Sequence, residues 1–260
     1  MKYCLTSRQP KTYLKKADEI IVPYKDRRII PDLAKEYPEV DIVLEITPNT
    51  TWDFDEIKEY HILSREKLIL CIPEIHPDVI GMIKEANIRF FWGYEINTPY
   101  ELAAMVNLGV CYVRLGAPLF FQTDIIKKYR IPGRITANVA HGGYLPHSDG
   151  VNGAWIRPED VDMYEGAVGM IEFSDCDISK EQALFRIYAE QKNWPGSLDM
   201  LISNLGADAT NRMIPSEFTE ARLNCGQRCA ALGACRLCYR HFALANPELI
   251  KNYVESMNQN

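Results

Sequence analysis

The feature that most constrains this chain is a repeated alternation between short apolar runs and segments that begin like helices. Nine runs rich in β-branched and aromatic residues occur up to residue 174, and most of them are continuously apolar. Continuous apolar runs of this length are typical of strands that are covered on both faces, as in parallel sheets. The runs read KYCLTS, EIIVPY, DIVLEIT, LILCIP, RFFWGYEI, CYVRLG, RITANVA, AWIRP and GMIEFS.

The segments between several of these runs carry helix start signals. Pro31, Pro77 and Pro99 each stand near the start of a segment with helical spacing, and Ser179 with Gln182 forms a capping box before ALFRIYAEQ. Proline suits the first helical turn because its missing N–H has no partner there, and a capping box satisfies two N–H groups. Strands and helices therefore alternate, which predicts an α/β protein.

About eight strand–helix units in roughly 200 residues fit a (β/α)8 barrel of the TIM type. Nine runs leave one surplus, and we assign AWIRP, in preference to KYCLTS, to an excursion outside the barrel. A doubly wound open sheet is the alternative, but no G-x-G-x-x-G motif follows the early strands. We therefore expect a TIM-like barrel over residues 1–195 and a small cysteine-rich, metal-binding extension over residues 196–260.

The extension contains four cysteines in the spacing C-x3-C-x5-C-x2-C. Thiolates so close in sequence can reach one metal centre at little loop-closure cost, whereas cysteines packed as hydrophobes on one helix would share a face, which these do not. The varied gaps favour an iron–sulfur cluster of the 4Fe–4S type, and zinc stays open as the alternative. The predicted ligands are Cys225, Cys229, Cys235 and Cys238.

Other bulk features point to a cytoplasmic protein with no membrane partner. No stretch approaches the ~18 consecutive apolar residues of a spanning helix, and the first residues lack the layout of a secretory signal. In a reducing compartment, Cys4, Cys71 and Cys111, which lie in or beside predicted strands, are expected to pack in the core. The net charge of −6 argues against a broad nucleic-acid-binding face. His61 is expected at the surface of a helix.

Polar residues follow nearly every predicted strand, at the end of a barrel where chemistry takes place. Such a ring could bind a polar, anionic or hydroxylated small molecule, with arginines as bidentate clamps and a histidine or carboxylate as proton carrier. A salt bridge or a helix cap is the alternative role for any one of them. We predict Glu172, His141 and Arg157 as catalytic residues. The predicted substrate-binding residues are Arg114, Glu45, Glu74, Glu95 and Asn138.

Several segments in this order carry a family resemblance. ELAAMVNLGVCYVRLGAPL has the pattern of a helix followed by a strand. NVAHGG contains a His-Gly step at His141 and Gly142, and WIRPEDV contains a proline and an aspartate two residues apart, Pro158 and Asp160. With GMIEFS and the helix after it, they resemble the collagenase-like peptidases, peptidase family U-thirty-two, over roughly residues 1–200. The resemblance implies relatives that include oxygen-independent hydroxylases of ubiquinone precursors and of RNA bases, several with an iron–sulfur cluster on four cysteines.

The chain also departs from that family. In the last motif only Ile171 and Glu172 match, because Met170, Phe173 and Ser174 replace the lysine, glycine and arginine, and the glutamate expected after VRLG is missing. The family's cysteines are spaced differently, so the resemblance implies cluster chemistry without assigning ligands. No Ser, His, Asp arrangement and no H-E-x-x-H motif independently signals a protease.

The sequence leaves two functions open. The first is an enzyme in which an iron–sulfur cluster serves redox or hydroxylation chemistry on a small polar substrate, or on an RNA base, at the barrel mouth. The second is a non-catalytic scaffold that binds a partner protein and carries a structural zinc knuckle. The sequence does not indicate an oligomeric state.

Overall fold

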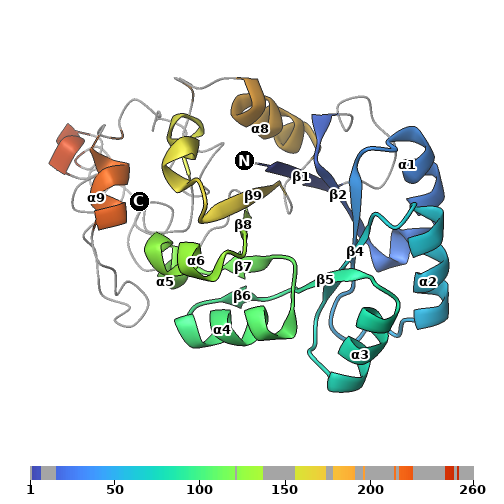
Figure 1. Ribbon diagram of the computed structural model, residues 1–260. Helices are drawn as coiled ribbons and strands as arrows, with labels where there is room; N and C mark the ends of the chain where they lie inside the picture. The colour runs from blue at the N-terminus through green and yellow to red at the C-terminus, as the bar shows by residue number, and fades with distance from the viewer. Residues whose placement is uncertain are drawn as a thin grey trace, which may run out of the picture.

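The computed structural model describes residues 2–6, 16–120, 122–136, 156–173, 178–190, 196, 214, 217–224, 244–248 and 251. Within these residues the strands form one parallel sheet (Figure 1). They are β1 (Lys2–Thr6), β2 (Glu19–Pro23), β3 (Asp41–Glu45), β4 (Leu68–Ile72), β5 (Arg89–Trp92), β6 (Glu95–Ile96), β7 (Val113–Leu115), β8 (Gly133–Thr136) and β9 (Val168–Phe173). Their order in the sheet is β5-β4-β3-β2-β1-β9-β8-β7-β6.

The two edge strands, β5 and β6, are consecutive pieces of one interrupted strand. Only Gly93 and Tyr94 separate them, β5 pairs with β4, and β6 pairs with β7. The Cys111 N–H also donates to the Phe90 carbonyl at 2.8 Å, which links β5 to the segment before β7. Because the two ends of the sheet are consecutive in the chain and β5 is linked to the segment before β7, the sheet curls into a nearly closed barrel of eight strand positions with the fifth one broken.

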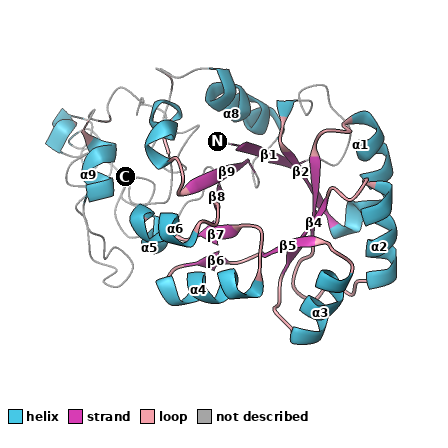
Figure 2. Ribbon diagram, in the orientation of Figure 1, coloured by secondary structure: helices cyan, strands magenta, loops and turns pink. Residues whose placement is uncertain are grey.

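Helices cover the outside of this barrel (Figure 2). The predicted proline starts are confirmed, since Pro31, Pro77 and Pro99 lie in the first turns of their helices. The helix after β9 is also present, but it begins at Ile178, so Ser179 lies inside the first turn. The helices are α1 (Ile30–Glu36), α2 (Phe54–Leu63), α3 (Pro77–Glu85), α4 (Pro99–Leu108), α5 (Ala117–Phe120), α6 (Thr123–Tyr129), α8 (Ile178–Glu190) and α9 (Phe218–Asn224), with the 3-10 turns η2 (Tyr24–Ile29) and η3 (Pro158–Tyr164).

The surplus run AWIRP is confirmed as lying outside the barrel where the structure describes it. Ile156 and Arg157 belong to no strand and lead into η3, whereas KYCLTS supplies β1. Of the C-terminal extension only short pieces are described, including α9. Residue 195, the last of the predicted barrel, and the cysteines at 225, 229, 235 and 238 fall outside the described residues. Among the described helices, none combines the length and apolar character needed to span a bilayer.

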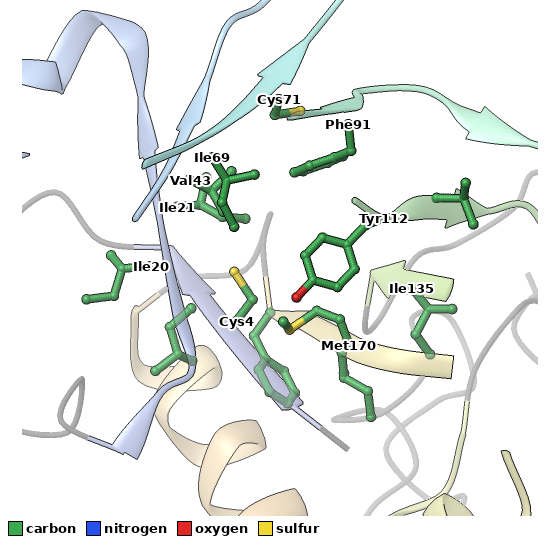
Figure 3. Close-up of a cluster of buried hydrophobic side chains, with 14 of the residues drawn as sticks. Cys4, Ile20, Ile21, Val43, Ile69, Cys71, Phe91, Tyr112, Ile135 and Met170 are labelled. Carbon is green, nitrogen blue, oxygen red and sulfur yellow. The ribbon is translucent and has the colours of Figure 1, made fainter. Parts of the chain in front are cut away.

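The strands bury both faces, as their continuous apolar runs predict. Ile21, Val43 and Ile69 point into the barrel, while the neighbouring Ile20 points outward (Figure 3) because successive strand residues face opposite sides. Cys4 and Cys71 lie in this interior and are buried, which confirms their expected role in the core.

His61 on α2 is buried, with 7% of its surface exposed, so the expectation that it lies at the surface is wrong. Burial lowers its pKa below the usual value, and the folded state therefore favours the neutral imidazole. We expect the unfolding free energy to fall as the pH drops below about 6.5, because the unfolded chain then binds the proton more readily. Urea unfolding at pH 7 and pH 5 should show a smaller pH-dependent loss for His61→Gln than for the wild type. The same change at the exposed His76 should leave the loss unaltered.

Candidate functional site

The barrel interior contains five charged side chains connected in series, which we call the interior ion-pair network. They are Glu19, Arg134, Glu172, Arg114 and Glu45. At its buried end, the Arg134 Nη1 lies 2.6 Å from Glu19 Oε2 and the Nε lies 2.5 Å from Glu172 Oε2. Both carboxylates are within 1% of complete burial, and Arg134 is fully buried. Buried charges of this kind require partners, and each has one.

The other end of the network reaches the mouth of the barrel. Arg114 Nη2 donates to Glu172 Oε1 at 2.8 Å and to Glu45 Oε1 at 3.2 Å. The side chains of Arg114 and Glu45 are 14% and 30% exposed, whereas that of Glu172 is 1% exposed. Glu45 is the last residue of β3, at the strand ends where barrels place their chemistry. The pair of Glu45 and Arg114 is therefore the part of the network that a ligand can reach.

Strand register explains why these side chains meet. Arg114 on β7 is paired with Arg134 on β8, and Cys4 on β1 is paired with both Glu19 and Glu172. Paired residues of neighbouring strands point to the same face, so all five project into the interior. Two guanidiniums side by side would repel, but each oxygen of Glu172 accepts from one of them. Glu172 is therefore the bridge that allows both arginines inside the barrel.

Aromatic rings cover the two guanidiniums. The Arg134 guanidinium carbon lies 4.8 Å from the centroid of Phe91 and 5.6 Å from that of Tyr112, and the Arg114 carbon lies 5.5 Å from Phe91. Cations over ring faces are stabilised by the ring quadrupole. Burial, with the nearby Glu19 carboxylate, raises the pKa of the Tyr112 hydroxyl above its usual value. Tyr112 is consequently a neutral neighbour of the network.

The break between β5 and β6 is joined to the mouth through Gly93. Its carbonyl accepts from Arg114 Nη1 at 2.7 Å, and its N–H donates to the Ile72 carbonyl at 2.8 Å. A Cβ on this residue would lie 3.2 Å from Cys71 Sγ and 3.3 Å from the Ile72 carbonyl oxygen. A larger residue would crowd these neighbours, so glycine suits the close approach at which the interrupted strand offers a carbonyl to Arg114.

Charge determines what the site can bind. With three carboxylates and two guanidiniums, the network has a net charge of −1. Both arginines already pair with carboxylates, and Arg114, the one that the sequence predicts at the mouth, donates to Glu172, Glu45 and the Gly93 carbonyl. Glu172 accepts from both guanidiniums, an arrangement that holds Arg114 in a fixed orientation. Glu45, with 30% of its side chain exposed, is the most accessible carboxylate of the network.

The other predicted mouth residues differ in their surroundings. Glu95 begins β6 and is in register with Arg114, and Glu74 is exposed in the loop after β4. Both residues lie near the break between β5 and β6, because Glu95 follows the break directly and Glu74 follows β4, the strand that pairs with β5. Asn138 and His141 fall outside the described residues.

Arg157 is held elsewhere. It forms two hydrogen bonds to Asp160, Nε to Oδ2 at 2.5 Å and Nη2 to Oδ1 at 3.0 Å, and is buried. The Thr219 hydroxyl on α9 also donates to Asp160 Oδ2. These contacts tie η3 to α9 and place Arg157 in a packed structural cluster, and no contact among the described residues links it to Glu172 or Arg114.

Arg134 and Glu19 were not predicted from the sequence. Arg134 begins the apolar run RITANVA, and Glu19 begins the run EIIVPY. A charged residue within a run that is otherwise buried is itself a signal, because an unpaired charge there would be costly and implies a partner of opposite sign. That signal, applied to both residues, predicts an ion pair inside the barrel.

No protein-family model and no curated protein matches the sequence. Several solved structures are similar at low identity. A structure described as native KDPGal is 12% identical, with a TM-score of 0.45, covering 73% of this chain and 93% of its own. A cube-shaped designed protein cage is 14% identical, with a TM-score of 0.43 and 73% of each chain covered. A glycerol uptake operon antiterminator-related protein from Thermotoga maritima is 10% identical, with a TM-score of 0.39, covering 67% of this chain and 95% of its own.

These similarities assign neither a family nor an activity. The class of the protein is instead defined by its own strand order, which is that of a parallel α/β barrel with a charged interior.

Proposed function

We propose that this chain is a barrel enzyme whose mouth binds a small polar substrate between Glu45 and Arg114. The observation that carries the proposal is the interior ion-pair network, which is buried at one end and partly exposed at the other. Glu172 is held by the buried Arg134 and in turn holds Arg114 in place. A fixed cation beside a partly exposed carboxylate is a preorganised binding group.

The charge of the network favours substrates that donate hydrogen bonds. Because both guanidiniums are neutralised and the net charge is −1, an anion would gain little from Arg114 and would be repelled by Glu45. Hydroxyl or amino groups would donate to Glu45 in charge-assisted hydrogen bonds. In this proposal Glu45 is the proton acceptor, Glu172 positions Arg114, and His141 and Asn138 remain predicted contributors from the loop after β8.

We further propose that Cys225, Cys229, Cys235 and Cys238 bind a 4Fe–4S cluster, with zinc as the alternative. Their close spacing supports these four cysteines as the ligands, and a cluster would supply the redox or hydroxylation chemistry that the resemblance implies. The scaffold function with a zinc knuckle has its own support, since an ion-pair network that neutralises most of its own charge is also what a purely structural interior would contain. An RNA substrate has less support, because phosphates avoid a mouth of negative charge.

The test of the mouth uses Glu45→Gln, which keeps the side-chain shape and removes the charge. A panel of small hydroxylated, amino and anionic molecules is screened by thermal shift against the wild type. We expect the stabilising compounds to be hydrogen-bond donors without negative charge. We expect Glu45→Gln to weaken them about 10-fold or more, since hydrogen bonds to charged groups contribute roughly 1.5–3 kcal/mol.

The matched control is Glu59→Gln, at an exposed position on α2, which should leave every affinity unchanged. Ligands that bind Glu45→Gln as tightly as the wild type, or a panel in which only anions bind, would contradict the proposed site.

A further inference from the structure

Arg114 donates to three acceptors at the mouth, and these acceptors differ in distance and exposure. The Gly93 carbonyl accepts from Nη1 at 2.7 Å, and Glu172 Oε1 accepts from Nη2 at 2.8 Å. Glu45 Oε1 accepts from the same Nη2 at 3.2 Å, and Glu45 is the more exposed of the two carboxylates. Gly93 and Glu172 therefore hold the guanidinium in place, and Glu45 covers it on the side nearer to solvent.

The residues paired with Glu45 on the neighbouring described strands carry no charge. In the strand register, Glu45 on β3 is paired with Pro23 on β2 and with Cys71 on β4. Cys71 points into the barrel interior (Figure 3). Burial raises the pKa of its thiol to about 12, so the thiol is neutral at pH 7. On these strands the Glu45 carboxylate thus has the Arg114 guanidinium as its partner, beside two uncharged neighbours.

Arg114 has enough donors to bind a carboxylate in place of Glu45. A guanidinium has five N–H donors, and the bonds to Gly93 and Glu172 use two of them. Nε is buried and has no hydrogen-bond partner among the described residues. Without the Glu45 carboxylate, one Nη2 donor would lose its acceptor, and the charge of the interior ion-pair network would change from −1 to 0. Loss of that charge also removes repulsion toward an incoming anion.

We propose that Glu45 occupies an anion-binding place on Arg114 and is the residue that determines the selectivity of the mouth. With Glu45 in place, the mouth accepts hydrogen-bond donors and excludes small carboxylates. Without it, Arg114 binds a carboxylate from solution. A carboxylate attached to the chain competes well against a free one, because its effective concentration beside Arg114 is high. The inference rests on the proposed function, because it names the specificity-determining residue of the same mouth.

The variant Glu45→Ala tests the proposal, because it removes a methylene group and a carboxylate, which together match acetate in size. Acetate, and acetamide as its uncharged analogue, are titrated into the full-length wild type and the variant. NMR line broadening of the ligand and thermal shift measure binding. We expect acetate to bind Glu45→Ala about 10-fold or more tightly than the wild type, the effect of one charge-assisted hydrogen bond. Acetamide should show no such gain, and adding Arg114→Met to Glu45→Ala should abolish the gain for acetate.

Three further variants serve as controls. Glu45→Gln fills the same space without a charge, so it should bind acetate less tightly than Glu45→Ala does. Glu39→Ala removes the carboxylate of an exposed pair, in which Glu39 Oε2 lies 3.5 Å from Lys67 Nζ, and it should gain no affinity for acetate. Glu45→Ser removes the same carboxylate and replaces the alanine variant if circular dichroism shows that the latter is unfolded.

The outcomes separate this inference from the proposed function. If donor ligands bind the wild type and need Glu45, but neither Glu45→Ala nor Glu45→Ser gains affinity for acetate, the inference is wrong while the proposed mouth stands. If Glu45→Ala gains acetate through Arg114 but no donor ligand needs Glu45, the inference stands and the proposed function is wrong. A gain in Glu39→Ala or Glu45→Gln as large as that in Glu45→Ala would also overturn the inference.

Discussion

Replacing Arg134 with methionine should lower the free energy of unfolding by about 3–5 kcal/mol, because it leaves Glu19 and Glu172 as buried carboxylates without their shared cation. Urea unfolding followed by circular dichroism at pH 7 measures the loss. The deficit should shrink at lower pH, since a buried carboxylate without a cation has a raised pKa and binds a proton on folding. A cavity effect alone would not depend on pH.

Two further variants isolate charge as the cause. Arg28→Met changes an exposed arginine on η2 and should alter stability by less than about 0.5 kcal/mol. Glu172 keeps its ion pair with Arg114, so Glu19 is the carboxylate that the single variant leaves without a cation. A double variant that adds Glu19→Gln to Arg134→Met should therefore regain part of the lost stability. If the double variant is no more stable than the single one at pH 7, packing rather than charge explains the effect.

Local patterns were enough to predict the barrel. The apolar runs and the proline starts are signals within a few residues of each other, and they placed the strands and the beginnings of α1, α3 and α4. The break in the fifth strand was not predicted, because RFFWGYEI is continuous as a pattern. The break appears only in the pairing, where β5 joins β4 and β6 joins β7, and pairing between distant segments is not visible in a local pattern.

The sequence predicted only those residues of the candidate site that stand near the ends of predicted strands. Looking for polar residues at strand ends identified Glu45, Arg114 and Glu172, which the structure brings together. It missed Glu19 and Arg134, because these residues belong to the interior of the barrel rather than to its loops.

Two other residues show what local patterns leave out. Arg157 belongs to the run AWIRP, which is no strand where it is described, and the pattern did not indicate that its guanidinium pairs with Asp160. His61 lies four residues after the buried Ile57 on α2, so the helical period could have predicted its burial.

The double variant Cys235→Ser, Cys238→Ser should lose its bound metal and much of its stability. Metal-binding energy is also folding energy, on the order of 10 kcal/mol for structural zinc in small domains, so half of a four-thiolate site cannot retain it. Anaerobic absorption spectra with iron and zinc analysis measure the metal, and thermal unfolding measures the stability. A brown wild type containing iron supports the cluster, and a colourless one with a single zinc supports the knuckle and the scaffold function.

The described cysteines make this test selective. Metal ligands are thiolates, and burial raises the pKa of Cys71 and of Cys111 to about 12 and that of Cys4 well above its usual value. These three therefore stay protonated at neutral pH and compete poorly for metal, so Cys111→Ala is a control that should retain the full metal content. If the double variant keeps its metal, or if Cys111→Ala loses it, the ligands are not the four cysteines near the C-terminus. The enzyme proposal would then depend on the mouth alone, where Glu45 and Arg114 offer acid–base and binding groups but no redox centre.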